Sequence, residues 1–373
     1  MPRSGIRVVL DEAIRLEGVC RLEIGQPDLP TPPHIVEAAA QAAREGYTGY
    51  TPNAGFASLR QAFAERLNEE RGLQVDPEQV VVTVGAMGAI FSALCAVVSP
   101  GDEVLVPDPG YPNYLMPIQL LGAKGVRYPL DAQAEFAIRA ETIRERVGPR
   151  TKAIMLNSPS NPTGAMIDPG ELEAIVSIAH EHGVYLISDE AYAHVCFDKP
   201  HLTPLRYGTD EQIIAIYSCS KTYSMTGWRV GFAVSSPATA ALLAKLQEAT
   251  VACAPSVSQK AAEAALLGPQ ACVEEMTRTY KRRRDLAVAL CRDLKLTAIP
   301  PRGAFYMMIA LPGRTATDST AYALRLLNEE RVAVAPGGTF GPLGEGFIRI
   351  ALCASEQTIA EGLRRIAAFT SRV

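Results

Sequence analysis

The sequence predicts an α/β fold, a three-layer sandwich around a mostly parallel central sheet, with a smaller α+β domain toward the carboxyl end. Short runs that are almost wholly apolar alternate with helical segments along the first two thirds of the chain. Such continuous apolar strands are typical of parallel sheets that helices cover on both faces. Polar side chains stand just after several of these runs, where open α/β sheets bind their ligands.

The strands of the predicted sheet alternate with helices and turns. Residues 80–84 are β-branched and apolar, and Gly85 and Gly88 separate them from a helical segment at 89–98. Further elements are predicted in the same way, namely strands at 103–106, 153–156, 184–187 and 213–217 and a helix at 171–181. Residues 80–98 carry no charge and are long enough to span a bilayer, but the β-branched start and the two glycines favour a strand, a turn and a helix. We therefore expect no membrane segment.

From about residue 236 the pattern changes. Helices are predicted at 238–250, 259–267 and 274–294, and an α+β series follows, with strands at 304–310, 332–334 and 346–352 and helices at 319–330 and 356–369. We expect residues 1–30 to be an N-terminal segment of the small domain, 31–268 to be the large domain, and 269–373 to be the small α+β domain.

Composition and charge exclude several classes of protein. Of the 373 residues, 48% are hydrophobic and 20% are charged, which is typical of a folded globular chain. The net charge of −4 gives no reason to expect a nucleic-acid partner. The basic run Lys281-Arg282-Arg283-Arg284 stands alone, so we interpret it as a solvated helix face.

Cysteine and histidine usage gives further limits. The eight cysteines show no CxxC spacing, and the chain shows no signal peptide, so we expect a reducing, cytoplasmic location. His180 and His182 are two residues apart on a predicted helix and face different directions, and the other histidines (His34, His194 and His201) show no ligand pattern. No metal is expected.

A lysine and an arginine stand together after the strand predicted at 213–217. Lys221 lies among the hydroxyls of Ser218 and Ser220, and Arg229 follows in a glycine-rich stretch. A lysine forms a Schiff base readily once desolvation or a nearby positive charge lowers the pKa of its amine, and an arginine can bind a phosphate with two parallel hydrogen bonds. Alone, each is more often a surface residue. Together they are the groups that hold pyridoxal phosphate.

Asp189, Tyr192 and Asn161 could hold an aromatic ring. Asp189 ends an apolar strand, where a half-buried carboxylate needs a cation, and a protonated pyridine nitrogen is one. The hydroxyl of Tyr192 and the amide of Asn161 could bind a phenolic oxygen on that ring. Each also has a simpler interpretation, Asp189 as a helix-capping or turn residue and Asn161, before Pro162, as a turn residue.

Three further places could complete the site. Gly85-Ala86-Met87 lies between a strand and a helix, where backbone N–H groups can approach a phosphate, although any tight turn uses glycine. Tyr111 could stack on a flat ring or simply pack within its loop. Arg349 is a lone charge in an apolar strand, so it needs an anion, either a substrate carboxylate or a structural ion-pair partner.

In this order the motifs resemble those of the fold-type-I pyridoxal phosphate enzymes, specifically the class I/II aminotransferases of the aspartate aminotransferase superfamily. They are Gly25-Gln26-Pro27-Asp28, Tyr50-Thr51-Pro52, Pro100-Gly101-Asp102, Asn161-Pro162-Thr163-Gly164, residues 188–192, Ser220-Lys221, residues 227–231, residues 303–306 and Arg349. The resemblance covers nearly the whole chain. It implies pyridoxal 5'-phosphate as cofactor, an amino acid and a 2-oxo acid as substrates, a ping-pong Schiff-base mechanism, and a homodimer with its sites at the interface.

The resemblance also implies a role for each candidate. Lys221 would be the Schiff-base lysine and proton carrier, Asp189 would pair with the pyridine nitrogen, and Tyr192 would join Asn161 on the phenolic oxygen. Tyr111 would stack on the ring. The phosphate would lie among Gly85, Ala86, Met87, Ser218, Ser220, Arg229 and Tyr50 of the partner subunit. Arg349 would bind the substrate α-carboxylate beside Asn161 and the Gly25 backbone.

One position departs from the family pattern. Where bacterial aspartate enzymes of this subgroup often carry a lysine for the distal carboxylate, this chain has Met87. An unpaired distal carboxylate would be poorly held, so we favour an amino donor with a neutral or apolar side chain.

Other activities stay open. A C–S β-lyase shares this fold and most of these motifs, and an aspartate aminotransferase is a further alternative. The Ser218-x-x-Lys221 spacing also occurs in penicillin-recognising acyl enzymes, but the Ser-Asp-Glu at 188–190 precedes it and no Lys-Thr-Gly is found.

Overall fold

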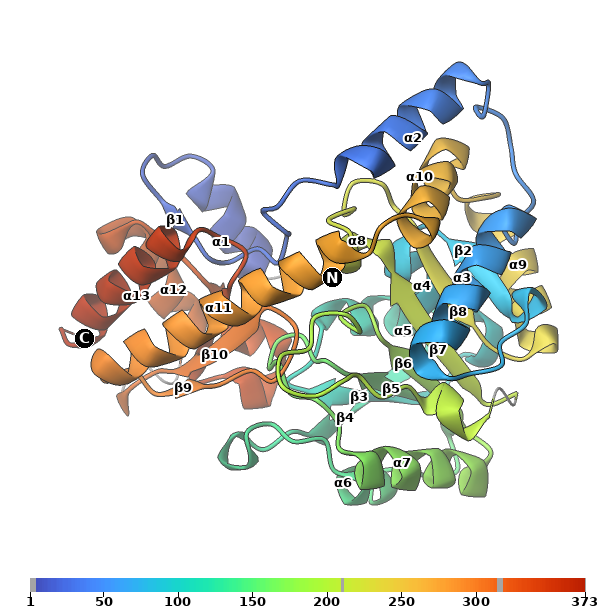
Figure 1. The fold of residues 1–373 in the computed structure, drawn as a ribbon. Helices are drawn as coiled ribbons and strands as arrows, with labels where there is room; N and C mark the ends of the chain where they lie inside the picture. Colours follow the sequence, from blue (N-terminus) through green and yellow to red (C-terminus); the bar gives the residue numbers. More distant parts are fainter. Residues whose placement is uncertain (1–4, 209–210, 314–317, 373) are drawn as a thin grey trace.

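The computed structural model describes residues 5–208, 211–313 and 318–372 and shows two bodies side by side (Figure 1). The larger body surrounds a twisted sheet. The smaller body contains the carboxyl-terminal part of the chain together with its first helix and strand, and α11 (Ala271–Asp293) runs along it toward the larger body.

The larger body is built on a seven-stranded sheet in the order β2-β8-β7-β6-β5-β3-β4. Its strands are β2 (Val80–Thr83), β3 (Glu103–Asp108), β4 (Lys124–Pro129), β5 (Thr151–Asn157), β6 (Tyr185–Asp189), β7 (Ile213–Ser218) and β8 (Gly231–Val234). Strand β8 is antiparallel to both of its neighbours, and the pairs from β7 through β4 are parallel. The mostly parallel sheet predicted from the apolar runs is confirmed.

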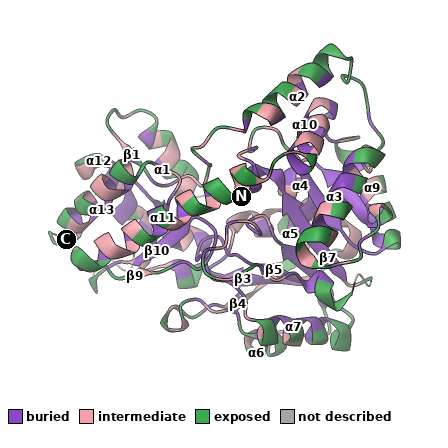
Figure 2. Cartoon of the chain, in the orientation of Figure 1, coloured by how far each residue is buried: buried purple, intermediate pink, exposed green. Residues whose placement is uncertain are grey.

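Helices cover both faces of this sheet and complete the three layers. One apolar cluster lies under α4 (Gly85–Val97), α5 (Leu115–Leu120) and α9 (Pro237–Thr250). The opposite face packs against α3 (Ala57–Arg71), α6 (Ala140–Arg144) and α7 (Pro169–His182), and its apolar cluster continues into α10 (Ser256–Leu267) on α3 and α2 (Pro33–Arg44) on α10. Figure 2 shows the sheet almost wholly buried, while the helices expose their outer faces.

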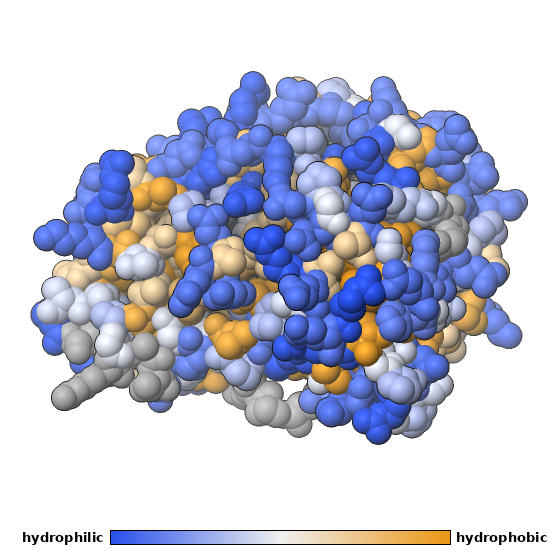
Figure 3. All heavy atoms as spheres, turned by 90° about the horizontal axis from the view of Figure 1, so that it is seen from below, coloured by the Kyte–Doolittle hydropathy of each residue, from blue (hydrophilic) through white to orange (hydrophobic). Residues whose placement is uncertain are grey.

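The charge-free stretch at 80–98 forms β2 and the whole of α4, as a strand followed by a helix. No helix in the described ranges is both long and apolar enough to cross a membrane. Seen from below, the molecular surface is mostly hydrophilic, with small separate apolar patches (Figure 3).

The smaller body contains two sheets. One is antiparallel, in the order β12-β13-β10-β9, with β9 (Ala298–Ile299), β10 (Tyr306–Ala310), β12 (Ala335–Pro336) and β13 (Phe347–Ala351). In the other, β1 (Cys20–Arg21) pairs in parallel with β11 (Val332–Ala333). The remaining helices are α1 (Gly5–Ala13), α12 (Ser319–Glu330) and α13 (Glu356–Thr370). Short 3-10 turns lie at Pro77–Gln79, Pro112–Tyr114, Ala132–Ala134, Pro204–Tyr207, Gly337–Phe340 and Pro342–Gly344.

The N-terminal segment packs with the last third of the chain. Val9 and Leu22 lie in the same buried cluster as Ile348 and Leu363. This packing supports a small domain formed by both ends of the chain. The domain boundaries near residues 30 and 268 stay a prediction.

The interpretation of the basic run as a solvated face is wrong for half of it. Arg283 and Arg284 are buried, at 7% and 9% exposure. Arg283 binds both carboxylate oxygens of Asp28, at 2.7 and 2.8 Å, and Arg284 pairs with Asp198 at 2.9 Å. Burying an arginine is tolerated where a carboxylate faces it, and these carboxylates come from distant parts of the chain.

We predict that Arg283→Ala lowers the free energy of unfolding by about 3 kcal/mol, because it removes a buried side chain together with its two charged hydrogen bonds to Asp28. Arg282→Ala, one residue earlier on α11, should change it by less than about 0.5 kcal/mol, since the Arg282–Glu356 pair is exposed. Denaturant unfolding of both variants measures this, and equal losses would contradict it.

Candidate active site

The ends of adjacent strands bring the predicted site residues to one edge of the large sheet. Asn157 at the end of β5 is paired with Asp189 at the end of β6. Ser218 at the end of β7 and Thr83 at the end of β2 both face Gly231, which starts β8 between them. The turns that follow these strands therefore meet in one place.

Lys221 lies on the short helix α8 (Cys219–Thr222), directly after β7. Its Nζ donates a 2.7 Å hydrogen bond to the carbonyl oxygen of Gly25, from the segment that follows β1. Burial lowers the pKa of this amine to about 8, and the charges of Arg229 and Arg349 act in the same direction, against an opposing effect of Cys353. At pH 7 about a tenth of the amine is then neutral, far more than for a lysine with its ordinary pKa.

Gly25 allows this approach because it has no side chain. A Cβ at this position would lie 1.7 Å from the hydroxyl oxygen of Tyr306, which no packing tolerates. The N-terminal segment therefore passes close to β10, with its carbonyl oxygen on the lysine.

Asp189 is buried, at 5% exposure, and both of its carboxylate oxygens accept hydrogen bonds from neutral donors. The hydroxyl of Tyr114 donates at 2.6 Å, and the backbone N–H of Ala191 donates at 3.1 Å. The second bond spans two residues, so it is also the turn contact that the sequence allowed for Asp189. Burial raises the pKa of this carboxyl group. A cation in front of Asp189 would stabilise its charged form, which is what the nitrogen of a pyridinium ring supplies.

Four tyrosines belong to this cluster, namely Tyr111, Tyr114, Tyr192 and Tyr306. Tyr111 packs edge to face on Tyr114, with ring centroids 5.4 Å apart, and its hydroxyl accepts a hydrogen bond from Asn113. The hydroxyls of Tyr192 and Tyr306 lie 2.9 Å apart. Burial raises the pKa of both of these hydroxyls, that of Tyr306 to about 12, so both stay protonated and can donate.

Arg349 is buried in β13, at 2% exposure, without a carboxylate partner among the ion pairs of the described residues. It donates to the amide oxygen of Asn161 at 2.9 Å and to the carbonyl oxygen of Glu23 at 2.5 Å, while its Nε has no hydrogen-bond partner. Its guanidinium lies over the ring of Tyr306 at 4.2 Å. The structural ion pair considered above is not present, and an anion can still be bound.

The N-terminus of α4 lies against Arg229. Gly85 has φ +68°, and a Cβ there would lie 2.6 Å from Nη2 of Arg229. A Cβ on Gly231 would lie 2.7 Å from the carbonyl carbon of Gly85 and 2.8 Å from the amide nitrogen of Ala86. Because the first N–H groups of a helix lack intrahelical partners, these close contacts form a cradle that a phosphate fits.

Two serines lie next to this cradle. Ser218 is paired with Gly231 across the sheet, and its hydroxyl accepts a 3.2 Å hydrogen bond from the backbone N–H of Ser220 at the start of α8. Met87 contributes its backbone to the first turn of α4, and its side chain packs on the apolar cluster beneath that helix. Tyr50 is the exception, because it is 92% exposed and takes no part in the contacts described above.

Sequence reasoning assigned no role to Tyr114, Tyr306 or Glu23. Tyr306 closes the recognised motif at 303–306, and Tyr114 follows the candidate Tyr111 by three residues. Their contacts link residues far apart in the chain, which no local pattern reveals. Glu23 gave no signal beyond its place near Gly25.

Comparison with known proteins agrees with the resemblance seen in the sequence. The family model described as "Aminotransferase class I and II" matches residues 17–366. An aspartate aminotransferase of Pyrococcus horikoshii is 36% identical over 368 residues, which cover 98% of this chain and 94% of that protein. A probable N-acetyl-LL-diaminopimelate aminotransferase of Bacillus subtilis is 37% identical over 369 residues, covering 98% and 93%.

Solved structures agree as well. The aspartate aminotransferase from Thermus thermophilus with maleate superposes with a TM-score of 0.94 at 36% identity, covering 99% of this chain and 97% of that one. The fold and the order of its elements are therefore shared along the whole chain.

In the cofactor-free protein, we expect Lys221 to react with a small amine-modifying reagent with a midpoint near pH 8, because burial holds the pKa of its amine at about 8. Only the neutral amine is nucleophilic, so a lowered pKa moves the reaction to lower pH. Peptide mass spectrometry across a pH series measures this, with the exposed Lys245 of α9 as internal reference. Equal midpoints for the two lysines would contradict it.

Proposed function

Because the chain belongs to the aminotransferase class I and II family and is a pyridoxal-phosphate-dependent aminotransferase, we propose that its catalytic site is the cluster around Lys221. Its substrates are an amino acid and a 2-oxo acid. The observation that carries the assignment is the amine of Lys221, whose pKa is lowered to about 8, in one cluster with the buried Asp189 and Arg349, neither of which belongs to an ion pair among the described residues.

The residues present fit the cofactor at each of its ends. Asp189 would face the ring nitrogen, Asn161 and Tyr192 the phenolic oxygen, and Tyr111 the ring face. The phosphate would be held by the backbone of Gly85, Ala86 and Met87, by Ser218, Ser220 and Arg229, and by Tyr50 of the partner subunit. When bound, pyridoxal phosphate supplies an electron sink for the charge left at the α-carbon of the substrate.

Lys221 is the group that moves the proton. With a pKa of about 8, its amine can accept a proton from the α-carbon and return one afterwards without a large energetic penalty in either direction. The carbonyl of Gly25 orients Nζ by its 2.7 Å hydrogen bond. The buried surroundings keep water away from the proton in transit.

Arg349 is the group that orients the substrate. Its hydrogen bonds to Asn161 and to the Glu23 carbonyl fix the plane of the guanidinium, and a bidentate pair with the α-carboxylate supplies the missing anion. An amino acid held in this way would place its α-carbon beside Lys221, together with the backbone of Gly25.

We propose a neutral or apolar side chain for the amino donor. Arg229 and Arg349 act electrostatically on Tyr111, and each already has an anion to bind, the cofactor phosphate and the α-carboxylate of the substrate. Met87 adds no charge at the position where a lysine would meet a distal carboxylate. Relatives that are named aspartate aminotransferases make aspartate the competing donor.

A homodimer and a cytoplasmic location complete the proposal. Tyr50 is almost fully exposed on the single chain, as expected of a side chain that reaches a partner's site. The eight cysteines are all free, which fits a reducing compartment.

The purified protein should show a visible absorbance band from the cofactor bound to Lys221, which single amino acids bleach while they release their 2-oxo acids in stoichiometric amounts. Lys221→Ala should lower turnover at least about a thousandfold, since it removes the acid–base group. Retained turnover would overturn the assignment of Lys221. A band that persists while pyruvate and ammonia accumulate would indicate a β-lyase, an alternative that the comparisons do not favour.

Met87→Lys should raise kcat/KM for aspartate about tenfold relative to a neutral amino acid, because a hydrogen-bonded charge pair is worth about that factor. The long lysine stem can keep the packing of Met87 while its amine reaches the site. Met87→Leu is the control and should leave the ratio unchanged. A wild-type preference for aspartate, or an unchanged ratio in Met87→Lys, would contradict the proposed donor class.

A further inference from the structure

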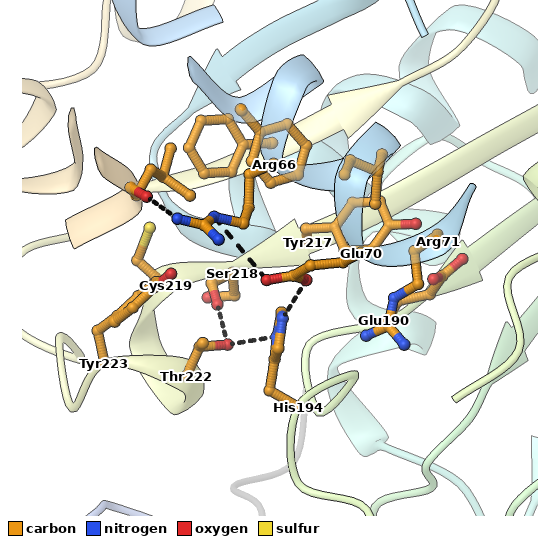
Figure 4. A pocket seen from close by; sticks show the side chains of 14 residues that line it. Arg66, Glu70, Arg71, Glu190, His194, Tyr217, Ser218, Cys219, Thr222 and Tyr223 are labelled. Carbon is orange, nitrogen blue, oxygen red and sulfur yellow. Dashed lines mark hydrogen bonds and ion pairs between the residues drawn. The ribbon is translucent and has the colours of Figure 1, made fainter. Parts of the chain in front are cut away.

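A pocket lies behind the proposed site, on the side of α8 that faces α3 (Figure 4). It is a small pocket that is partly open to solvent. It is lined by side chains from α3, from the ends of β6 and β7, and from α8, among them Arg66, Glu70, His194 and Thr222. None of these four has a role in the proposed chemistry.

A chain of hydrogen bonds crosses this pocket from α3 to α8 (Figure 4). The carboxylate of Glu70 lies 2.8 Å from Nε2 of His194, and Nδ1 of the same ring lies 3.2 Å from the hydroxyl of Thr222. The Thr222 hydroxyl also reaches the carbonyl oxygen of Ser218, at 3.4 Å. This series of hydrogen bonds therefore ends at Thr222, the residue next to Lys221, and at the backbone carbonyl of Ser218.

Neighbouring helices hold Glu70 and His194, the end of this series of hydrogen bonds that lies away from Lys221. Arg66 lies 3.9 Å from Glu70 and donates to the carbonyl of Leu266 on α10 at 2.6 Å. The backbone carbonyl of His194 accepts from Thr277 of α11 at 2.7 Å. Burial alone would raise the pKa of Glu70, but its hydrogen bond with His194 and the charges of Arg71 and Arg66 hold that pKa below its ordinary value, so this carboxylate stays ionised.

Helix α8 needs such support because it has only four residues, Cys219–Thr222, too few to be stable by themselves. A lysine that carries a proton must be held within a fraction of an ångström of its target. We propose that Glu70, His194 and Thr222 are positioning residues, which fix α8 against α3 and so aim the amine of Lys221. The inference rests on the proposed role of Lys221.

Chemistry sets the direction of the hydrogen bonds. An ionised carboxylate only accepts, so Nε2 of His194 carries a hydrogen toward Glu70. Nδ1 of the neutral ring then accepts the Thr222 hydroxyl hydrogen, whereas a protonated ring would turn that hydrogen toward the Ser218 carbonyl. The other titratable or charged side chains that line the pocket are Arg66, Arg71, Glu190, Tyr217, Cys219 and Tyr223.

The test compares Thr222→Val, which removes the hydroxyl and keeps the shape, with Thr222→Ser, which keeps the hydroxyl. In the holoenzyme, Thr222→Val should lower kcat about tenfold, the value of one hydrogen bond, with KM for the amino donor unchanged because Arg349 is untouched. It should also shift the pH at which the cofactor's visible band changes. Thr222→Ser should match the wild type in all three measurements.

Two controls separate positioning from general stability. Thr250→Val removes a hydroxyl that bonds to the backbone carbonyl of Leu246 within α9, away from the site, and should leave kcat unchanged. Glu70→Leu, with the exposed Glu65→Leu of the same helix as its control, tests the far end of the chain and should show the same fall in kcat at constant KM. It also decides the matter if Thr222→Val does not fold.

Wild-type kcat and spectral pH dependence in Thr222→Val, or in Glu70→Leu where the first variant is unfolded, would overturn this inference and leave the proposed function standing. A wild-type protein without a cofactor band would overturn both together.

Discussion

The site depends on keeping ionisable side chains buried without letting them neutralise one another. Asp189, Lys221 and Arg349 belong to one cluster, yet none of the ion pairs found in the described ranges joins any two of them. Neutral donors and acceptors hold each in place, such as the Tyr114 hydroxyl on Asp189 and the Gly25 carbonyl on Lys221. The electrostatic cost of this arrangement falls on the free protein, and ligands with complementary charges at the matching positions relieve it.

Much of the fold could be predicted because the central strands are buried on both faces. Strands β5, β6 and β7 read as continuous apolar runs and were found within one or two residues at each end. Strand β4 lies at the edge, carries two charged residues and a glycine among its six, and was missed. Strand β8 was missed because it has four residues and starts with a glycine. The buried arginines of α11 were also missed, because their carboxylate partners lie far away in the sequence.

In the candidate site, too, features with a local sequence signal could be predicted, and contacts between distant residues could not. Residues that directly follow a predicted strand, such as Asp189, Ser218 and Lys221, could be placed at one edge of the sheet from the sequence alone. What the sequence could not predict is how these groups are supported. The hydrogen bonds between Tyr114 and Asp189 and between His194 and Thr222 join residues that are 75 and 28 positions apart. No regular spacing in the sequence marks such pairs.

The close contact between the first and last parts of the chain has a consequence for synthesis. Glu23 and Arg349 are hydrogen-bonded across 326 residues, and β1 finds its only partner strand, among the described strands, in β11. A ribosome therefore releases the segment around Gly25 long before the strand that anchors it exists. The large sheet can form during translation, but the site is not complete until β13, which carries Arg349, has also emerged.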